Sequence, residues 1–243
     1  MRTSNPAFKR FLEIAATDSQ DQMTINGAIH KTLALLVLAI VGASFTWVLA
    51  GSNPAAGQTL MIVGAVGGLI LAFVTIFSPA KAMLTAPLYA IFEGLLLGGI
   101  SAYAQAMYPG IALQAVLLTF GTLFALLIAY RSGIVRPTQR FKAGIMAATM
   151  AIGLVLVVGF IFSLVGLGRM SIFGSGPIGI VFSLVVVVIA ALNLVLDFDF
   201  IEQGAKRQIP AHYEWYAAFG LLVTLVWLYF EILHLLMKLQ SRD

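Results

Sequence analysis

The sequence predicts an all-α integral membrane protein, built as a bundle of seven transmembrane helices. Sixty per cent of its 243 residues are hydrophobic and only ten per cent are charged, whereas a soluble domain carries roughly 25% charged residues. The apolar residues gather in seven runs, each near the ~20 residues that cross a bilayer as a helix. The runs are too long for barrel strands and do not alternate, so we expect helices, which satisfy their own backbone hydrogen bonds in lipid.

The elements follow in order along the chain. Residues 1–31 are polar and mixed in charge, and no apolar core follows the first basic residues as it would in a signal peptide. We therefore expect a cytosolic N-terminal leader at 1–31 and one transmembrane domain at 32–243. The expected spans are 32–50, 58–78, 84–104, 111–130, 143–166, 177–201 and 215–238. Turn-forming residues separate them at 51–54, 78–79, 108–110 and 174–177.

The orientation follows from the distribution of Lys and Arg. With the N-terminus in the cytosol, eleven of the fourteen lie in inside segments, which is a clear positive-inside bias. These are Arg2, Lys9, Arg10, Lys31, Lys81, Arg131, Arg136, Arg140, Lys142, Lys206 and Arg207. Seven spans put the C-terminus outside, and a re-entrant last helix would return it to the cytosol. We expect a multi-pass integral membrane protein with its N-terminus in the cytosol.

Composition also excludes several kinds of chemistry. The chain has no cysteine, which removes disulfides, thiolate catalysis and cysteine metal sites. Its net charge of +4 comes from loop residues and shows no basic stripe interleaved with aromatics, so no nucleic-acid partner is expected. No GxGD motif and no GxSG-like nucleophile with a matched histidine is present, so we predict no intramembrane enzyme and no cofactor. The lipid bilayer is an expected partner, and the sequence leaves protein partners open.

Glycines spread through the runs indicate close helix packing. Gly94 and Gly98 are four residues apart, a spacing that lets another helix approach closely.

Four acidic residues lie within expected spans, and they are the functional candidates. They are Glu93, Asp197, Asp199 and Glu231. Carboxylates in a membrane are costly and mark functional sites by default. No Lys or Arg lies deep in a span to pair with them. An unpaired buried carboxylate takes up a proton or faces water, so the set suits a pH sensor, a cation site or a proton relay.

Helix geometry separates these candidates. Residues 197 and 199 are about 200° apart on a helix, so only one of them faces the bundle interior. We favour Asp197, which shares a face with Asn193, and interpret Asp199 as a boundary residue that snorkels or binds a loop. Glu231 has His234 one turn later. Glu93, Asp199, His234 and Asn193 are secondary candidates.

Depth argues against a simple contact between the two main candidates. At ~1.5 Å per residue, Asp197 lies about 6 Å from the cytosolic end of its span, and Glu231 about 24 Å from Trp215. Contact would require the segment before the last span to project below the membrane, or its helix to tilt or bend.

Several stretches resemble the Bax inhibitor-1 family, the transmembrane Bax-inhibitor-motif proteins, in a prokaryotic form. They are MRTSNPAF (1–8), MTINGAIHKT (23–32), EGLLLGGIS (93–101), NLVLDFDFIE (193–202) and LYFEILHLL (228–236). The resemblance implies a protein of a prokaryotic cell (inner) membrane, with seven helices of which the last is central and surrounded by the other six. It also implies a pH-sensitive calcium leak channel that closes when carboxylates on helices six and seven share a proton.

By motif, the family's two carboxylates map onto Asp197 and Glu231. This chain has Glu where the family often has Asp, so the second carboxylate reaches one methylene further. The resemblance makes Asp197 and Glu231 the pH-sensing and gating residues and a transient cation site, with no fixed metal. Calcium and protons are then the expected ions.

Two other functions remain open from the sequence. A proton-coupled transporter of a cation or solute would use the same acids, although paired broken helices are not seen. A membrane scaffold that regulates partner proteins would need no flux at all. Selectivity and oligomeric state are not predicted.

Overall fold

A computed structural model describes residues 22–165 and 171–241. In these ranges the chain forms seven long helices and two short 3₁₀ turns, η1 (Pro79–Lys81) and η2 (Ser171–Phe173). The helices are α2 (Ile25–Ser52), α3 (Pro54–Phe77), α4 (Ala82–Met107), α5 (Ile111–Arg131), α6 (Gln139–Leu164), α7 (Pro177–Lys206) and α8 (Tyr213–Gln240). All seven are long and apolar enough to cross a membrane, so the predicted fold class is confirmed.

The helix ends follow the turn chemistry of the sequence. Asn53 ends α2 and caps α3, because its side chain accepts a hydrogen bond from the N–H of Ala56 at 3.1 Å. Gly110 adopts a φ of 88° before α5, a conformation that favours glycine. The first span was expected from residue 32 but begins at Ile25. The Thr24 hydroxyl caps it by accepting from the N–H of Gly27 at 2.9 Å.

Glycine permits a close helix contact between α2 and α4. A Cβ at Gly94 would overlap the backbone of Ala39, and one at Gly98 would overlap the backbone of Ala43. The predicted close approach at these two glycines is therefore confirmed, with α2 as the partner helix.

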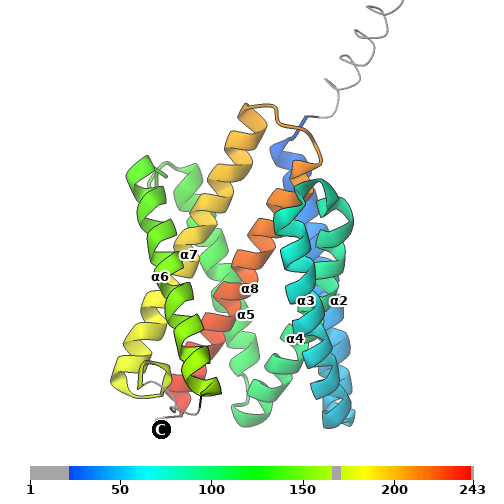
Figure 1. Cartoon of the computed structure of the whole chain (residues 1–243), viewed down its shortest axis with the longest axis vertical. Helices are drawn as coiled ribbons and strands as arrows, with labels where there is room; N and C mark the ends of the chain where they lie inside the picture. The colour runs from blue at the N-terminus through cyan, green and yellow to red at the C-terminus, as the bar shows by residue number, and fades with distance from the viewer. Residues whose placement is uncertain (1–21, 166–170, 242–243) are drawn as a thin grey trace, which may run out of the picture.

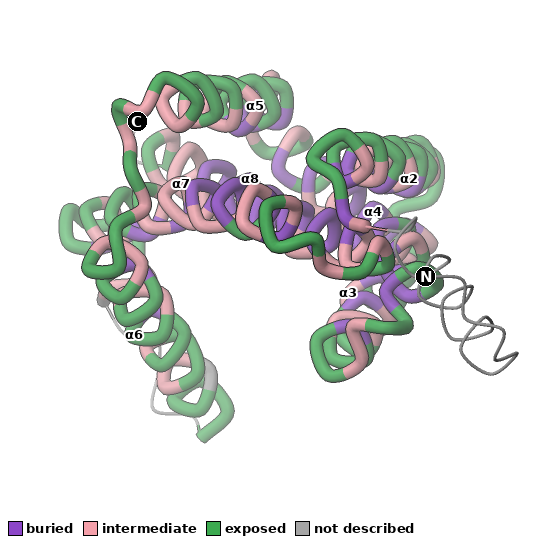
Figure 2. The backbone as a smooth tube through the Cα atoms, turned by 90° about the horizontal axis from the view of Figure 1, so that it is seen from above, coloured by how far each residue is buried: buried purple, intermediate pink, exposed green. Residues whose placement is uncertain are grey.

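The last helix, α8, is the most buried of the seven spans and α6 is the least buried. α8 packs against α7, α2, α4 and α5, while α3 packs on α4 and α2, and α6 packs on α7. Figure 2 shows α6 and α3 on the outside of the bundle. Four helices thus cover α8, and a complete ring of six around it is not confirmed.

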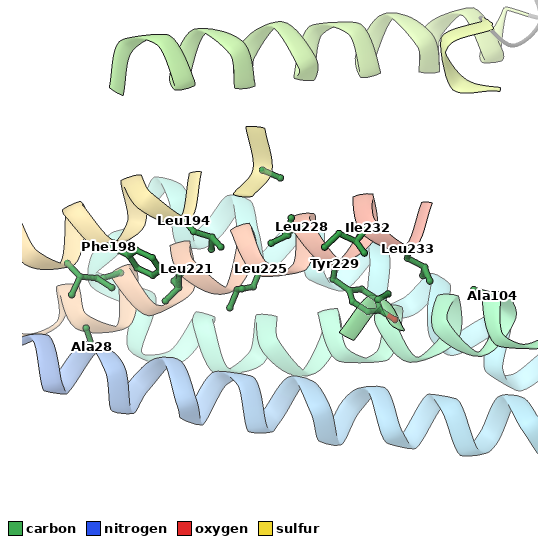
Figure 3. Packing of buried hydrophobic residues seen from close by; sticks show 14 of the residues in the cluster. Ala28, Ala104, Leu194, Phe198, Leu221, Leu225, Leu228, Tyr229, Ile232 and Leu233 are labelled. Carbon is green, nitrogen blue, oxygen red and sulfur yellow. The ribbon is translucent and has the colours of Figure 1, made fainter. Parts of the chain in front are cut away.

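The interface of α7 with α8 forms much of the core. Leu194 and Phe198 of α7 belong to one buried cluster with Leu221, Leu225 and Leu228 of α8, as Figure 3 shows. The two helices are joined by the short connection 207–212, so they run antiparallel and residues equally far from this connection lie opposite one another.

Both ends of the bundle can be followed in Figure 1. The start of α2 and the α7–α8 connection lie at the same end, where Gln22 pairs with Pro210 in an isolated β-bridge. α8 then runs without interruption to the opposite end. The described chain therefore shows a spanning last helix rather than a re-entrant one.

Candidate functional site

Asp197 lies on the face of α7 that meets α8. Its Oδ1 atom is 3.8 Å from the position a Cβ would take at Gly220, and its carboxyl interacts with the Thr224 hydroxyl. Its Oδ2 atom is buried and has no hydrogen-bond partner. No ion pair to Asp197 is found among the described residues. The prediction that Asp197 faces the bundle interior agrees with this placement.

Asp199 points away from α8 and binds α6. Its Oδ2 atom forms an ion pair with Lys142 Nζ, in the first turn of α6, and the residue is 8% exposed. The opposite facing of Asp197 and Asp199 thus follows the helical geometry. Asp199 is buried and ion-paired, however, and does not snorkel. The expectation that no basic residue pairs with these acids was wrong for Asp199, because Lys142 was assigned to the loop before the span and in fact belongs to α6.

Glu231 lies in the second half of α8, and its polar partners belong to the same helix. Its Oε1 atom accepts a hydrogen bond from Trp227 Nε1 at 3.3 Å, one turn earlier. Lys238, two turns later, interacts electrostatically with Glu231 and donates to Ser183 Oγ of α7 at 2.8 Å. His234 is on the exposed side of the same helix. The polar contacts of Glu231 are therefore separate from those of Asp197.

Asp197 and Glu231 are not brought together. Asp197 lies opposite Gly220 and Thr224, and Glu231 follows Thr224 by seven residues, which is about 10 Å along the helix axis. The antiparallel pairing explains this, since Asp197 is nine residues before the end of α7 at Lys206, and Gly220 is seven after the start of α8. The contact implied by the family resemblance is absent from this conformation, as the depth estimate indicated.

The remaining candidates lie elsewhere in the bundle. Glu93 of α4 is 8% exposed and faces α3, where a Cβ at Gly68 would lie 2.8 Å from its Oε2 atom. The Asn193 amide donates to Thr149 Oγ1 of α6 at 2.9 Å and to the Ile189 carbonyl at 2.8 Å. Asn193 and the Lys142–Asp199 pair thus hold α6 against α7.

Glu214 is a buried acid that was not among the predicted candidates, because it lies just before the last expected span, 215–238. It is 5% exposed at the start of α8 and accepts hydrogen bonds from the Thr24 N–H at 2.7 Å and the Thr24 hydroxyl at 2.9 Å. Its second oxygen pairs with Lys31 Nζ, and a Cβ at Gly27 would overlap the carboxylate. Thr24, Gly27 and Lys31 are spaced three and four apart, so one helix face of the stretch 23–32 converges on Glu214.

A second polar group lies at the same end of the bundle, between α5 and α7. The Tyr130 hydroxyl and Lys206 Nζ both donate to Glu202.

Among the described residues, no three His, Asp or Glu side chains converge on one point where they could hold a metal ion. The arrangement around Asp197 instead offers one unpartnered carboxylate oxygen, which can take a proton or contact a passing cation.

Comparison with known proteins agrees with this architecture. A family model described as Bax inhibitor 1 like matches residues 5–241, nearly the whole chain. No curated protein and no solved structure matches the chain. Together with seven apolar helices in the described residues, this match shows that the chain belongs to the Bax inhibitor 1 like family of multi-pass membrane proteins.

Proposed function

We propose that this protein provides a proton-controlled leak pathway for cations, with calcium as the permeating ion. The observation that carries the proposal is the Oδ2 atom of Asp197, which is buried within a membrane span and has no hydrogen-bond partner. An isolated carboxylate is costly in such a place, so residues of this kind line ion or proton pathways. Membership of the Bax inhibitor 1 like family supports a channel-like role.

The chemistry of the site depends on one proton. When Asp197 is charged, its free oxygen attracts a cation. The Thr224 hydroxyl of α8, which donates to the Gly220 carbonyl at 3.2 Å in the described structure, can then turn to donate to the carboxylate. When Asp197 is protonated, the charge is lost and the carboxyl can donate a hydrogen bond across the α7–α8 interface. The open pathway therefore belongs to the charged form and the closed pathway to the protonated form.

Glu231 enters the proposal as a second acid, on α8, the helix that also carries Thr224. The shared proton implied by the family resemblance needs Glu231 to approach Asp197. In the described conformation Asp197 lies opposite Thr224, and Glu231 is about 10 Å further along the axis of α8. We assign proton sensing to Asp197. Sharing with Glu231 would belong to a conformation in which α8 has shifted against α7, with the bond from Trp227 to Glu231 broken.

The proposed orientation places the start of α2 in the cytosol of a prokaryotic cell. α3, α5 and α7 end at that end of the bundle and α4, α6 and α8 begin there, so the lysines and arginines at or near these helix ends and the start of α2 lie there, as the positive-inside rule requires. They are Lys31, Lys81, Arg131, Arg136, Arg140, Lys142, Lys206 and Arg207.

Calcium flux from proteoliposomes tests the proposal. The full chain is reconstituted, and flux is measured at a series of pH values with the same pH on both sides of the membrane. A leak pathway gives flux at every symmetric pH at which Asp197 is charged, and this flux rises as pH rises. Flux that appears only under an imposed proton gradient would contradict a leak and would indicate proton-coupled exchange. Absence of flux under both conditions, with the purified protein folded, would leave the scaffold role instead.

A further inference from the structure

An apolar cleft of about 410 Å³ lies between α2 and α5. Ile40 and Trp47 of α2 form one rim, and Leu113 and Val116 of α5 form the other. The floor comes from α4 and α8 and includes the buried residues Leu225 and Tyr229. All four helices are membrane spans, and the lining extends from the first turn of α5, at Ala112 and Leu113, to residues in the middle of α2 and α8, such as Ile40 and Leu225. The cleft is separate from Asp197, Glu231 and Glu214, none of which lines it.

The cleft opens sideways, toward the bilayer. α2 and α5 have no substantial packing contact with one another, and Figure 2 shows them apart, with α8 and α4 beneath the space between them. The rim side chains are apolar and exposed, with Ile40 at 56% and Val116 at 37%. What faces this opening at such a depth is hydrocarbon.

The buried hydroxyls of the lining are already paired. Ser101 Oγ and Tyr229 OH form a hydrogen bond of 2.6 Å, and Ser101 also donates to the Leu97 carbonyl at 2.5 Å. The Thr119 hydroxyl donates to the Ala115 carbonyl at 2.7 Å. An ordered water needs two to four polar partners, and large cavities lined by apolar side chains stay dry and bind apolar molecules. The floor of the cleft therefore favours an apolar occupant over water.

We propose that the cleft between α2 and α5 is a binding site for one acyl chain of a membrane lipid. Protein interiors are close-packed, and a void of this size leaves its lining without contact partners unless something fills it. The lateral opening admits a chain without its headgroup leaving the interface. A bound chain contacts Leu225, next to Thr224, and so touches the helix that also carries the partner of Asp197. The site does not depend on the proposed leak function.

Photolabelling tests the site. The full chain is reconstituted in phosphatidylcholine vesicles that contain a phosphatidylcholine with a diazirine in the middle of one acyl chain, and labelled residues are mapped by mass spectrometry. Lipid at the outer surface reaches exposed residues only. Label on the buried floor, at Leu225, Tyr229 or Ser101, is the expected result. Label confined to outward-facing positions would overturn the proposal.

Rim variants with matched controls sharpen the test. Val116→Trp narrows the cleft, whereas Leu117→Trp adds the same side chain at the next residue, which is 63% exposed and outside the cleft. Ile40→Trp and Val41→Trp form the same comparison on α2, and they decide the matter if Val116→Trp fails to fold. We expect floor labelling to be lost in both rim variants and kept in both controls. Floor labelling that persists in the folded rim variants would contradict a chain bound in the cleft.

A water-filled cleft is the competing outcome, and the absence of cysteine makes it testable. A single Leu225→Cys variant is treated in vesicles with a charged, membrane-impermeant thiol reagent from both sides. The proposal expects no modification in the folded protein. Rapid modification would show an aqueous cavity and would overturn the acyl-chain site.

Discussion

The N–H and the hydroxyl of Thr24 both donate hydrogen bonds to Glu214, at 2.7 and 2.9 Å, and so tie the start of α2 to the start of α8. The residues on either side reinforce this tie. The Met23 N–H donates to the Ile209 carbonyl at 2.8 Å, and the buried Met23 side chain packs against Gly204. The α7–α8 connection is thus held by the residues that lead into α2.

Gly27→Ala should loosen this tie. The added Cβ would overlap the Glu214 carboxylate, which Thr24 and Lys31 hold in place, so the carboxylate must move and lose hydrogen bonds. We expect a loss of about 1–3 kcal/mol in the free energy of unfolding, measured by thermal unfolding in detergent. Gly51→Ala in the same helix is the control, because its Cβ would meet nothing within 4 Å. Equal melting temperatures for the two variants would contradict the prediction.

The pair Lys142–Asp199 should couple α6 to α7. Removing either partner leaves a partly buried charge alone. The loss in the free energy of unfolding for Lys142→Met, and likewise for Asp199→Asn, should therefore exceed half of the loss for the double variant. A double-mutant cycle should give a coupling free energy of about 0.5–3 kcal/mol. Arg140→Met, at an exposed residue in the same turn, should have little effect. Additive losses in the cycle would mean that the ion pair does not hold α6.

The hydrogen bond between Ser101 and Tyr229 predicts an unequal pair of variants. Ser101 Oγ donates to the Leu97 carbonyl, so the Tyr229 hydroxyl must donate to Ser101. Ser101→Ala then leaves a buried Tyr229 hydroxyl without a partner and should lower the free energy of unfolding by about 1–3 kcal/mol. Tyr229→Phe leaves Ser101 bonded to Leu97 and should lower the free energy of unfolding by less. Tyr103→Phe, at an exposed residue of α4, the helix that carries Ser101, should have almost no effect. Unfolding measurements that reverse this order would refute the assignment of donors.

Cysteine pairs should report how α7 lies against α8. The chain has no cysteine of its own, so Asp197→Cys/Gly220→Cys and Asp197→Cys/Glu231→Cys can be compared directly. Disulfides need Cα atoms about 4.4–6.8 Å apart. We expect the first pair to cross-link under mild oxidation and the second to remain reduced, as judged by mass spectrometry. Efficient cross-linking of 197 to 231 would show that the two acids meet, as the family resemblance implied.

Much of this fold is predictable from the sequence because the bilayer restricts it. A run of ~20 apolar residues can cross lipid only as a helix, so hydropathy and the turn residues between 51 and 177 place all seven helices. The ends are harder to predict. α2 begins seven residues before the expected span because the Thr24 hydroxyl caps it, and a polar stretch such as 25–31 gives no hydropathy signal for a membrane helix.

The helix faces of the site were predictable, and the tertiary partners of its acids were not. The 100° turn per residue separates Asp197 from Asp199 without any structure. The pairing of Asp199 with Lys142 and of Glu214 with Thr24 depends on how distant helices pack, and Glu214 is 190 residues from Thr24. Spacing along one helix says nothing about such contacts. The stretch 23–32 did carry a signal, since Thr24, Gly27 and Lys31 share a face that needs a partner.

The most direct test of the account is the pH dependence of calcium flux through Asp197→Asn, measured in proteoliposomes with equal pH on both sides. Asparagine keeps the size of the side chain but cannot change its charge. The account predicts that wild-type flux rises with pH, that Asp197→Asn flux stays flat, and that Glu93→Gln, which changes a buried acid facing α3, keeps the wild-type response. An Asp197→Asn protein that is folded and still follows the wild-type pH curve would contradict the central role of Asp197.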